Sequence, residues 1–119
     1  MNDERKYDLE TRTEKFSLRV RDLCRLLKHD IINREYIIQL IRAAGSVGAN
    51  YIEANDKVGD KDLRFKIRIS KREAKECRYW LNHIDTNKEN ELESERLLLI
   101  NEAEELMKIF AAILRKLGD

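Results

Sequence analysis

Proline is absent from this chain of 119 residues, glycine occurs only four times and cysteine only twice. Proline and glycine form turns and interrupt regular elements, so their scarcity excludes a loop-rich secreted fold and argues against a β-sandwich. Charged residues, in contrast, make up 39% of the sequence. This combination is typical of long helices with charged outer faces. We therefore predict an all-α protein with a single domain spanning residues 1–119.

Long hydrophobic runs are also missing. The longest apolar stretches, such as residues 109–114, fall far short of the roughly 20 residues that a membrane span requires. The N-terminal sequence MNDERKYDLETRTEK is too charged for a signal peptide. Cys24 and Cys77 lie far apart and lack a CxxC spacing, which is typical of reduced thiols packed in a core. The sequence thus predicts a cytoplasmic protein with no membrane role.

The residue patterns of known catalytic and metal sites are absent as well. His29 and His83 are the only histidines, and neither belongs to an HExxH, an ExxH or a cysteine–histidine metal motif. Glu73 and Glu76 lie one turn apart and are expected to form surface ion pairs. An enzyme that used Glu53 and Glu73 as acid and base would need a pocket containing both. We predict no enzyme activity, no metal, no cofactor and no small-molecule substrate.

Apolar residues recur at helical spacing in four segments, which are bounded by turn and cap signals. The first spans about Asp8 to His29, after residues 1–7 that are expected to fray. Asn33 is the predicted cap of a second segment that ends near Asp56, and Asp60 in the KVGD loop is the predicted cap of the third. A polar break at about 85–90 precedes the fourth, which Gly118 should end.

Only a few residues connect successive segments, so each helix should run antiparallel to the one before it. The predicted architecture is an antiparallel up-down-up-down four-helix bundle. A two-hairpin rearrangement, or a dimer swapped through the KVGD loop, would fit the same periodicity.

The second segment contains Gly45 and Gly48, each of which costs a helix about 0.5–1 kcal/mol relative to alanine. On a helical wheel, its core face is predicted to contain Ile37, Leu40, Ile41, Ala44, Val47, Gly48 and Tyr51. Ser46, Asn50 and Glu53 form a polar line on the opposite side. This line is either a solvated surface or a contact for another helix, and the small residues would then allow close approach. A kink at Gly45 is the further alternative.

Basic residues line the third segment at helical spacing, and we call this line the basic ridge: Lys61, Arg64, Arg68, Lys71, Lys75 and Arg78. The fourth segment is acidic, so the chain is polarised although its net charge is only +1. The ridge either pairs with the acidic helix, the commoner arrangement, or binds the phosphates of a nucleic acid. Tyr79 and Trp80 adjoin the ridge. An exposed tryptophan can stack on a base, although aromatic residues at a helix end more often belong to a core or interface.

Two stretches, SVGANYIEAND and RFKIRISKREAKECRYWLNHI, resemble the 23S rRNA intervening-sequence protein family of small bacterial four-helix bundles. In the first, the family pattern is a serine, an asparagine four residues later and a glutamate three further on, here Ser46, Asn50 and Glu53. In the second, an arginine–isoleucine pair leads into a glutamate-containing segment with an aromatic–leucine end. The matching residues are Arg68, Ile69, Glu73, Glu76, Tyr79, Trp80 and Leu81. The resemblance is clear over residues 37–84.

The resemblance implies a ring-like homopentamer of bundles with no established enzymatic chemistry, and a role in binding RNA or DNA. A relative of the same architecture, the accessory variability determinant of diversity-generating retroelements, is a basic pentamer that binds nucleic acid. The leading hypothesis is a non-catalytic oligomer with Ser46, Asn50, Glu53 and Glu73 at contacts between helices or subunits. The second is nucleic-acid binding through the basic ridge. The alternative is a protein-interaction or scaffold module without nucleic-acid binding.

Overall fold

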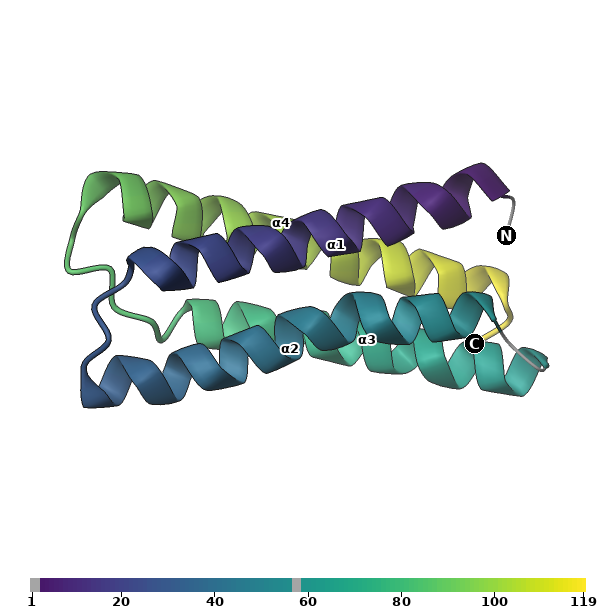
Figure 1. The fold of residues 1–119 in the computed structure, drawn as a ribbon. Helices are drawn as coiled ribbons and strands as arrows, with labels where there is room; N and C mark the ends of the chain where they lie inside the picture. The colour runs from purple at the N-terminus through teal and green to yellow at the C-terminus, as the bar shows by residue number, and fades with distance from the viewer. Residues whose placement is uncertain (1–2, 57–58) are drawn as a thin grey trace.

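In the computed structural model, which describes residues 3–56 and 59–119 with side chains from Asp8 onward, four long helices pack side by side (Figure 1). The chain direction reverses at each connection, and both termini lie at the same end (Figure 1). The predicted all-α class and four-helix bundle are confirmed. The helices are α1 (Asp3–Leu26), α2 (Ile31–Asn55), α3 (Asp60–Leu81) and α4 (Asn90–Lys116).

The core seam of α3 follows the alternating spacing of four and three residues that the sequence shows. All six seam residues within the helix are buried, namely Leu63, Ile67, Ser70, Ala74, Cys77 and Leu81. Ser70 is the one polar member, and its hydroxyl donates a 2.9 Å hydrogen bond to the carbonyl oxygen of Val47 in α2. Because this buried hydroxyl has a partner, it joins α3 to α2 without a desolvation penalty.

The glycines of α2 occupy different environments, although the helix continues unbroken through both. A Cβ atom at Gly48 would lie 3.0 Å from Oγ1 and 3.3 Å from Cβ of Thr13 in α1, whereas a Cβ at Gly45 would meet nothing within 4 Å. Thr13 is fully buried, and its hydroxyl donates to the carbonyl oxygen of Leu9 at 2.8 Å. Gly48 therefore permits the close packing of α1 on α2, and the predicted kink at Gly45 does not occur.

Several predicted helix ends require correction. α1 begins at Asp3 rather than near Asp8 and ends at Leu26 rather than His29. Asp30, not Asn33, caps α2, since its side chain accepts a hydrogen bond from the backbone N–H of Asn33 at 2.8 Å. Asp60 is the first residue of α3 and not its cap; Gly59 occupies the cap position without a side-chain hydrogen bond. Lys57 and Val58 of the KVGD loop lie outside the described residues.

The predicted end of α4 at Gly118 is confirmed. Gly118 has a φ of +83°, a backbone conformation that glycine adopts without strain. Its N–H donates to the carbonyl oxygen of Arg115, and the N–H of Asp119 donates to that of Leu114. This pair of bonds is a Schellman motif, which satisfies the last carbonyl groups of the helix.

Asn33 joins two connections that are far apart in the sequence. Its side-chain Nδ2 donates to the carbonyl oxygens of Lys28 at 2.9 Å and Asp85 at 3.0 Å. Its Oδ1 accepts from the backbone N–H of Asp85 at 2.8 Å. Asn33 is only 1% exposed, so its amide replaces water for backbone groups of the α1–α2 and α3–α4 connections.

We expect Gly45→Ala to raise the free energy of unfolding of the dissociated, monomeric bundle by about 0.5–1 kcal/mol, because the methyl group reduces backbone freedom and enters space that is open within the single chain. Gly48→Ala should give a smaller gain or a loss, because its methyl group must displace Thr13. Urea unfolding at a fixed protein concentration measures both changes. In a Thr13→Ala background, Gly48→Ala should stabilise like Gly45→Ala; equal gains in the original background would contradict the close packing.

Asn33→Ala should lower the free energy of unfolding by about 1–3 kcal/mol, since it leaves three hydrogen-bonding backbone groups without their partner. Asn82→Ala is the matched control, because Asn82 is exposed and its side chain makes a single bond to the Arg78 carbonyl within its own helix turn. Urea denaturation should show a change within about 0.5 kcal/mol for the control. Similar losses for both variants would show that Asn33 does not join the two connections.

Candidate nucleic-acid interface

The basic ridge lies on the side of α3 away from its core seam. Lys61, Arg68, Lys71 and Lys75 are exposed, and Arg64 and Arg78 are half-buried. Arg72, which the sequence analysis left out of the ridge, is also exposed on α3, one turn beyond Arg68. Its position four residues after Arg68 was the available signal. Of the acidic α3 residues, Glu73 is half-buried and interacts electrostatically with Arg42 of α2 and with Arg72, whereas Glu76 is exposed.

Two acidic residues of α4, Glu95 and Glu102, pair with α1 rather than with the ridge. Arg12 donates from Nε and Nη2 to the two carboxylate oxygens of Glu102 at 2.7 and 2.8 Å. Arg19 makes the same bidentate contact with Glu95, with Nε donating at 3.1 Å and Nη2 at 2.7 Å. In each arginine, the hydrogen bond to its glutamate, together with nearby negative charge, raises the pKa above its ordinary value despite partial burial. These pairs hold α1 against α4, on the flank of α4 that faces α1.

Two ridge residues do have acidic neighbours. Arg78 Nη1 lies 4.0 Å from Glu104 Oε1, and Arg68 pairs with the side chain of Asp119. Within residues 8–56 and 59–119, the remaining four form no ion pair, namely Lys61, Arg64, Lys71 and Lys75. The pairing with the acidic helix that the sequence left open therefore occurs at two positions and leaves most of the ridge available.

A shallow groove of about 330 Å³ runs along the ridge where α3 meets α4. Its apolar floor includes Met107 and Leu114, and its charged lining includes Arg68, Lys71, Arg72 and Lys75 together with Asp119. A groove with four basic groups and one acidic group favours an anionic ligand with repeated charges over a neutral small molecule.

The predicted motif residues gather on the flank between α2 and α3. Glu53 Oε2 lies 2.6 Å from Lys66 Nζ, and this ion pair connects the two helices. Asn50 and Ser46 are half-buried, and the Asn50 amide donates to the Ser46 carbonyl oxygen within α2 at 2.8 Å. Burial and the neighbouring Glu76 raise the pKa of Glu73. The sequence predicted that the polar line lies on the side of α2 opposite the core. This prediction is wrong, because the line lies on the flank of α2 that adjoins α3.

The outermost face of α2 carries exposed apolar residues together with the charged Glu35 and Arg42. Ile31, Ile38 and Ile52 lie on it at multiples of seven residues and are 79%, 52% and 52% exposed. Gly45 shares this face, and Ile41 is 45% exposed, so the prediction that Ile41 belongs to the core is wrong. The face of α2 that packs into the core is centred on Leu40, Val47 and Tyr51, and Ile37 lies at the edge of this face. We call this surface the α2 apolar line: Ile31, Ile38, Ile41, Gly45, Ala49 and Ile52.

Four rings cluster at the end of α3. Trp80 is half-buried and packs against Tyr36 of α2, with ring centroids 6.0 Å apart. Tyr79 is 56% exposed and contacts Trp80 edge-on at 4.9 Å and His83 at 4.3 Å. Trp80 thus packs between helices, as aromatic residues at a helix end usually do, and Tyr79 is the ring that faces solvent.

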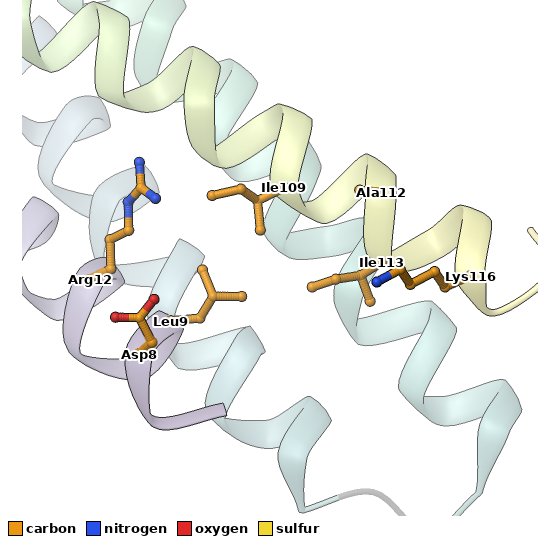
Figure 2. Close-up of a pocket in the computed structure, with 7 residues that line it drawn as sticks. All are labelled: Asp8, Leu9, Arg12, Ile109, Ala112, Ile113 and Lys116. Atoms are coloured by element: carbon orange, nitrogen blue, oxygen red, sulfur yellow. The ribbon is translucent and has the colours of Figure 1, made fainter. Parts of the chain in front are cut away.

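Figure 2 shows a cavity of about 270 Å³ between the start of α1 and the end of α4. Leu9, Ile109 and Ile113 point into it, and Arg12 and Lys116 lie at its margins (Figure 2). Its described lining holds no cysteine, serine or histidine, and its charged members are Asp8, Arg12 and Lys116.

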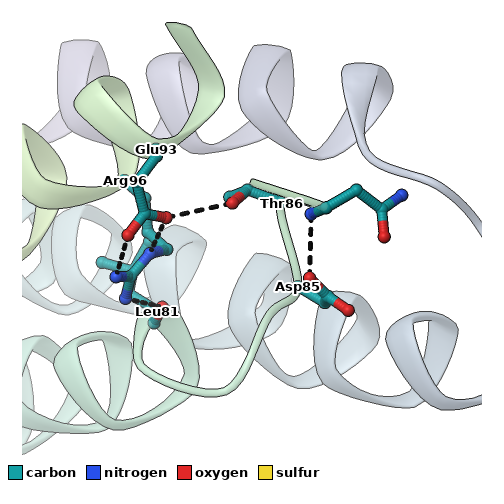
Figure 3. A network of polar contacts seen from close by, with 6 residues as sticks. Leu81, Asp85, Thr86, Glu93 and Arg96 are labelled. Carbon is teal, nitrogen blue, oxygen red and sulfur yellow. Dashed lines mark hydrogen bonds and ion pairs between the residues drawn. The ribbon is translucent and has the colours of Figure 1, made fainter. Parts of the chain in front are cut away.

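Other polar and reactive groups have structural roles. Glu93 accepts hydrogen bonds from Arg96 and Thr86, which lower its pKa to about 2, and Arg96 also donates to the Leu81 carbonyl oxygen (Figure 3). These hydrogen bonds join the start of α4 to Thr86 of the α3–α4 connection and to the end of α3. Burial raises the pKa of the Cys24 thiol to about 12 and that of Cys77 also above its ordinary value. Both cysteines are therefore neutral thiols in the core.

The described residues contain neither a cluster of metal ligands nor a membrane-spanning helix. None of their His, Cys, Asp and Glu side chains form a group of three or more suited to a metal ion. No helix in this part of the chain has the length and apolarity needed to cross a membrane.

The fold and surface define a small four-helix bundle with a basic outer ridge on α3. The family model described as 23S rRNA-intervening sequence protein matches residues 5–112, and the chain belongs to this family. The resemblance inferred from residues 37–84 is thereby confirmed, and the match extends into both outer helices.

A solved structure has a similar fold. It is the crystal structure of a protein with unknown function from the S23 ribosomal protein family of Bacteroides thetaiotaomicron, with a TM-score of 0.74 and 24% sequence identity. The similarity covers 88% of this chain and 96% of that chain. A comparison with curated proteins finds no match.

Proposed function

We propose that this protein is a non-catalytic, self-assembling bundle of the bacterial cytoplasm that binds RNA or DNA through the basic ridge of α3. The observation that carries the proposal is the distribution of ion pairs. Arg12 and Arg19 of α1 engage Glu102 and Glu95 of α4, whereas four of the six ridge residues have no ion-pair partner among the described residues. An unpaired line of basic side chains attracts a phosphate backbone through counterion release.

The geometry of the ridge also suits an extended polyanion. Lys61 and Arg78 are 17 positions apart, which corresponds to about 25 Å along a helix. The basic side chains between them recur at every turn, and the groove beside them carries four basic groups. A compact anion would engage only one or two of these charges, whereas a nucleic-acid backbone can engage them together.

Assembly is supported by the α2 apolar line. Three isoleucines at heptad spacing that are each at least half exposed form a large apolar strip for a soluble bundle, and such strips mark contact sites. Gly45 and Ala49 carry little side chain, so a second helix can approach closely at the middle of the line. The polar groups of Ser46, Asn50 and Glu53 lie beside it and can form the rim of the contact. We propose that this surface joins subunits, in a homopentamer as the family resemblance implies.

The α2 apolar line also fits a second candidate function, a scaffold that binds a helix of another protein and no nucleic acid. The same apolar contacts would serve a partner helix as well as a second copy. The two candidates differ in what the basic ridge does, so they separate in a binding experiment.

Fluorescence anisotropy with labelled RNA and DNA oligonucleotides tests the ridge. A triple variant, Arg64→Gln, Lys71→Gln and Lys75→Gln, should lose at least about tenfold in affinity and reduce the slope of log K against log salt by about two to three, because each side chain neutralises one phosphate. The unmodified protein should lose affinity steeply as salt rises.

The matched control removes the same charge elsewhere, with Lys15→Gln, Lys28→Gln and Arg115→Gln on exposed positions outside α3. We expect this control to keep most of the affinity. Equal losses in the two triple variants would indicate non-specific attraction and refute a ridge site. Absence of binding at low salt would leave the scaffold as the better account.

Light scattering and sedimentation velocity test the assembly. The unmodified protein should show a mass near five times 14.2 kDa. Ile38→Lys with Ile52→Lys should shift it toward the monomer, because two charges would be buried in the contact. Leu97→Lys with Leu98→Lys is the control, since both leucines are similarly exposed but lie on α4. A monomeric unmodified protein at micromolar concentration would rule the assembly out.

A further inference from the structure

The outer face of α3 carries two aromatic rings whose exposure the fold does not explain. Phe65 is 55% exposed and Tyr79 is 56% exposed, although a bundle core is available on the other side of the same helix. Both rings lie on the helix that carries the basic ridge.

The two rings lie in line with basic residues. Starting at Lys61, spacings of four and three residues alternate along α3, so the side chains share one outward stripe. All of its members are exposed, and in order they are Lys61, Phe65, Arg68, Arg72, Lys75 and Tyr79. Phe65 and Tyr79 are 14 positions apart, about 21 Å along the helix, with three basic residues between them.

The Tyr79 ring is held in place before any ligand arrives. Trp80 meets it edge-on, with an interplanar angle of 86°, and His83 packs against it at a centroid distance of 4.3 Å. The His83 ring is fixed in turn by a 2.7 Å hydrogen bond between its Nδ1 and the Tyr79 carbonyl oxygen. A ring held on one side and open on the other can stack on a planar ligand at little entropic cost.

We propose that Phe65 and Tyr79 stack on unpaired bases, so that α3 binds single-stranded nucleic acid in preference to duplex. This inference rests on the proposed function of the basic ridge and specifies its ligand. Basic side chains that follow the backbone and aromatic rings that stack on bases are the combination by which proteins hold single strands. The bases of a duplex are stacked on one another and present only their edges in the grooves, so they cannot cover these rings.

Anisotropy with four probes tests the proposal: a single-stranded 15-nucleotide RNA, its DNA counterpart, a duplex of the same length, and a single strand with abasic sites. We expect tighter binding to both single strands than to the duplex, and weaker binding to the abasic strand. Phe65→Ala and Tyr79→Ala should each weaken single-strand binding by about fivefold to a hundredfold while leaving duplex binding and the salt slope unchanged. The paired variant should bind the intact and abasic strands equally.

Two controls exclude other causes. Tyr79→Phe keeps the ring and should keep the affinity, and Leu98→Ala removes an equally exposed apolar side chain on α4 and should have no effect. Equal binding of single strand and duplex, with no effect of Phe65→Ala and Tyr79→Ala, would overturn this inference and leave the ridge proposal standing. Failure of every probe at low salt would overturn both. An altered oligomer mass in Phe65→Ala, with unchanged affinity, would assign Phe65 to a subunit contact and also overturn the inference.

Discussion

The two ion pairs between α1 and α4 neutralise charges on the facing flanks of these two helices. Arg12 and Arg19 each hold a carboxylate of α4 through two hydrogen bonds, in partly buried positions. Pairs of this kind contribute about 0–1 kcal/mol each to stability, so their effect on the folding free energy is small. Their effect on charge distribution is larger. They neutralise Glu95 and Glu102 on the flank of α4 that faces α1, whereas four of the six ridge residues on α3 have no ion-pair partner among the described residues.

A second constraint is the close packing of α2 against its two neighbouring helices, α1 and α3. Gly48 admits Thr13 of α1 on one side, and the Val47 carbonyl accepts the Ser70 hydroxyl of α3 on the other. With both flanks occupied, the remaining face of α2 points directly away from the bundle. That face carries exposed isoleucines, so the same close packing that orders the core also presents an apolar strip to solvent.

The sequence predicted best where a pattern is strict and failed where a choice depends on distant residues. The core seam of α3 was predictable because only one stripe of that helix is apolar. In α2, apolar residues occur all round, and the sequence alone could not decide whether Ile41 or Ala43 faces inward. Asn33 suited a cap by its residue type, but its actual partner Asp85 lies 52 positions away. The basic ridge followed from spacing, whereas the pairing of its members depends on where the fold places Glu104 and Asp119.

A net charge of +1 does not weaken the case for a phosphate-binding surface, because mobile ions limit the range over which charges act. At physiological ionic strength the Debye length is about 8 Å, whereas the ridge extends about 25 Å and α3 separates it from the acidic groups beside α2. A ligand on α3 therefore responds to the local charges and only weakly to the total. In a ring of subunits joined through α2, each copy would contribute one such ridge. Several weak contacts to one strand would then act together, and the effective concentration of neighbouring sites would raise the overall affinity without any additional basic residue.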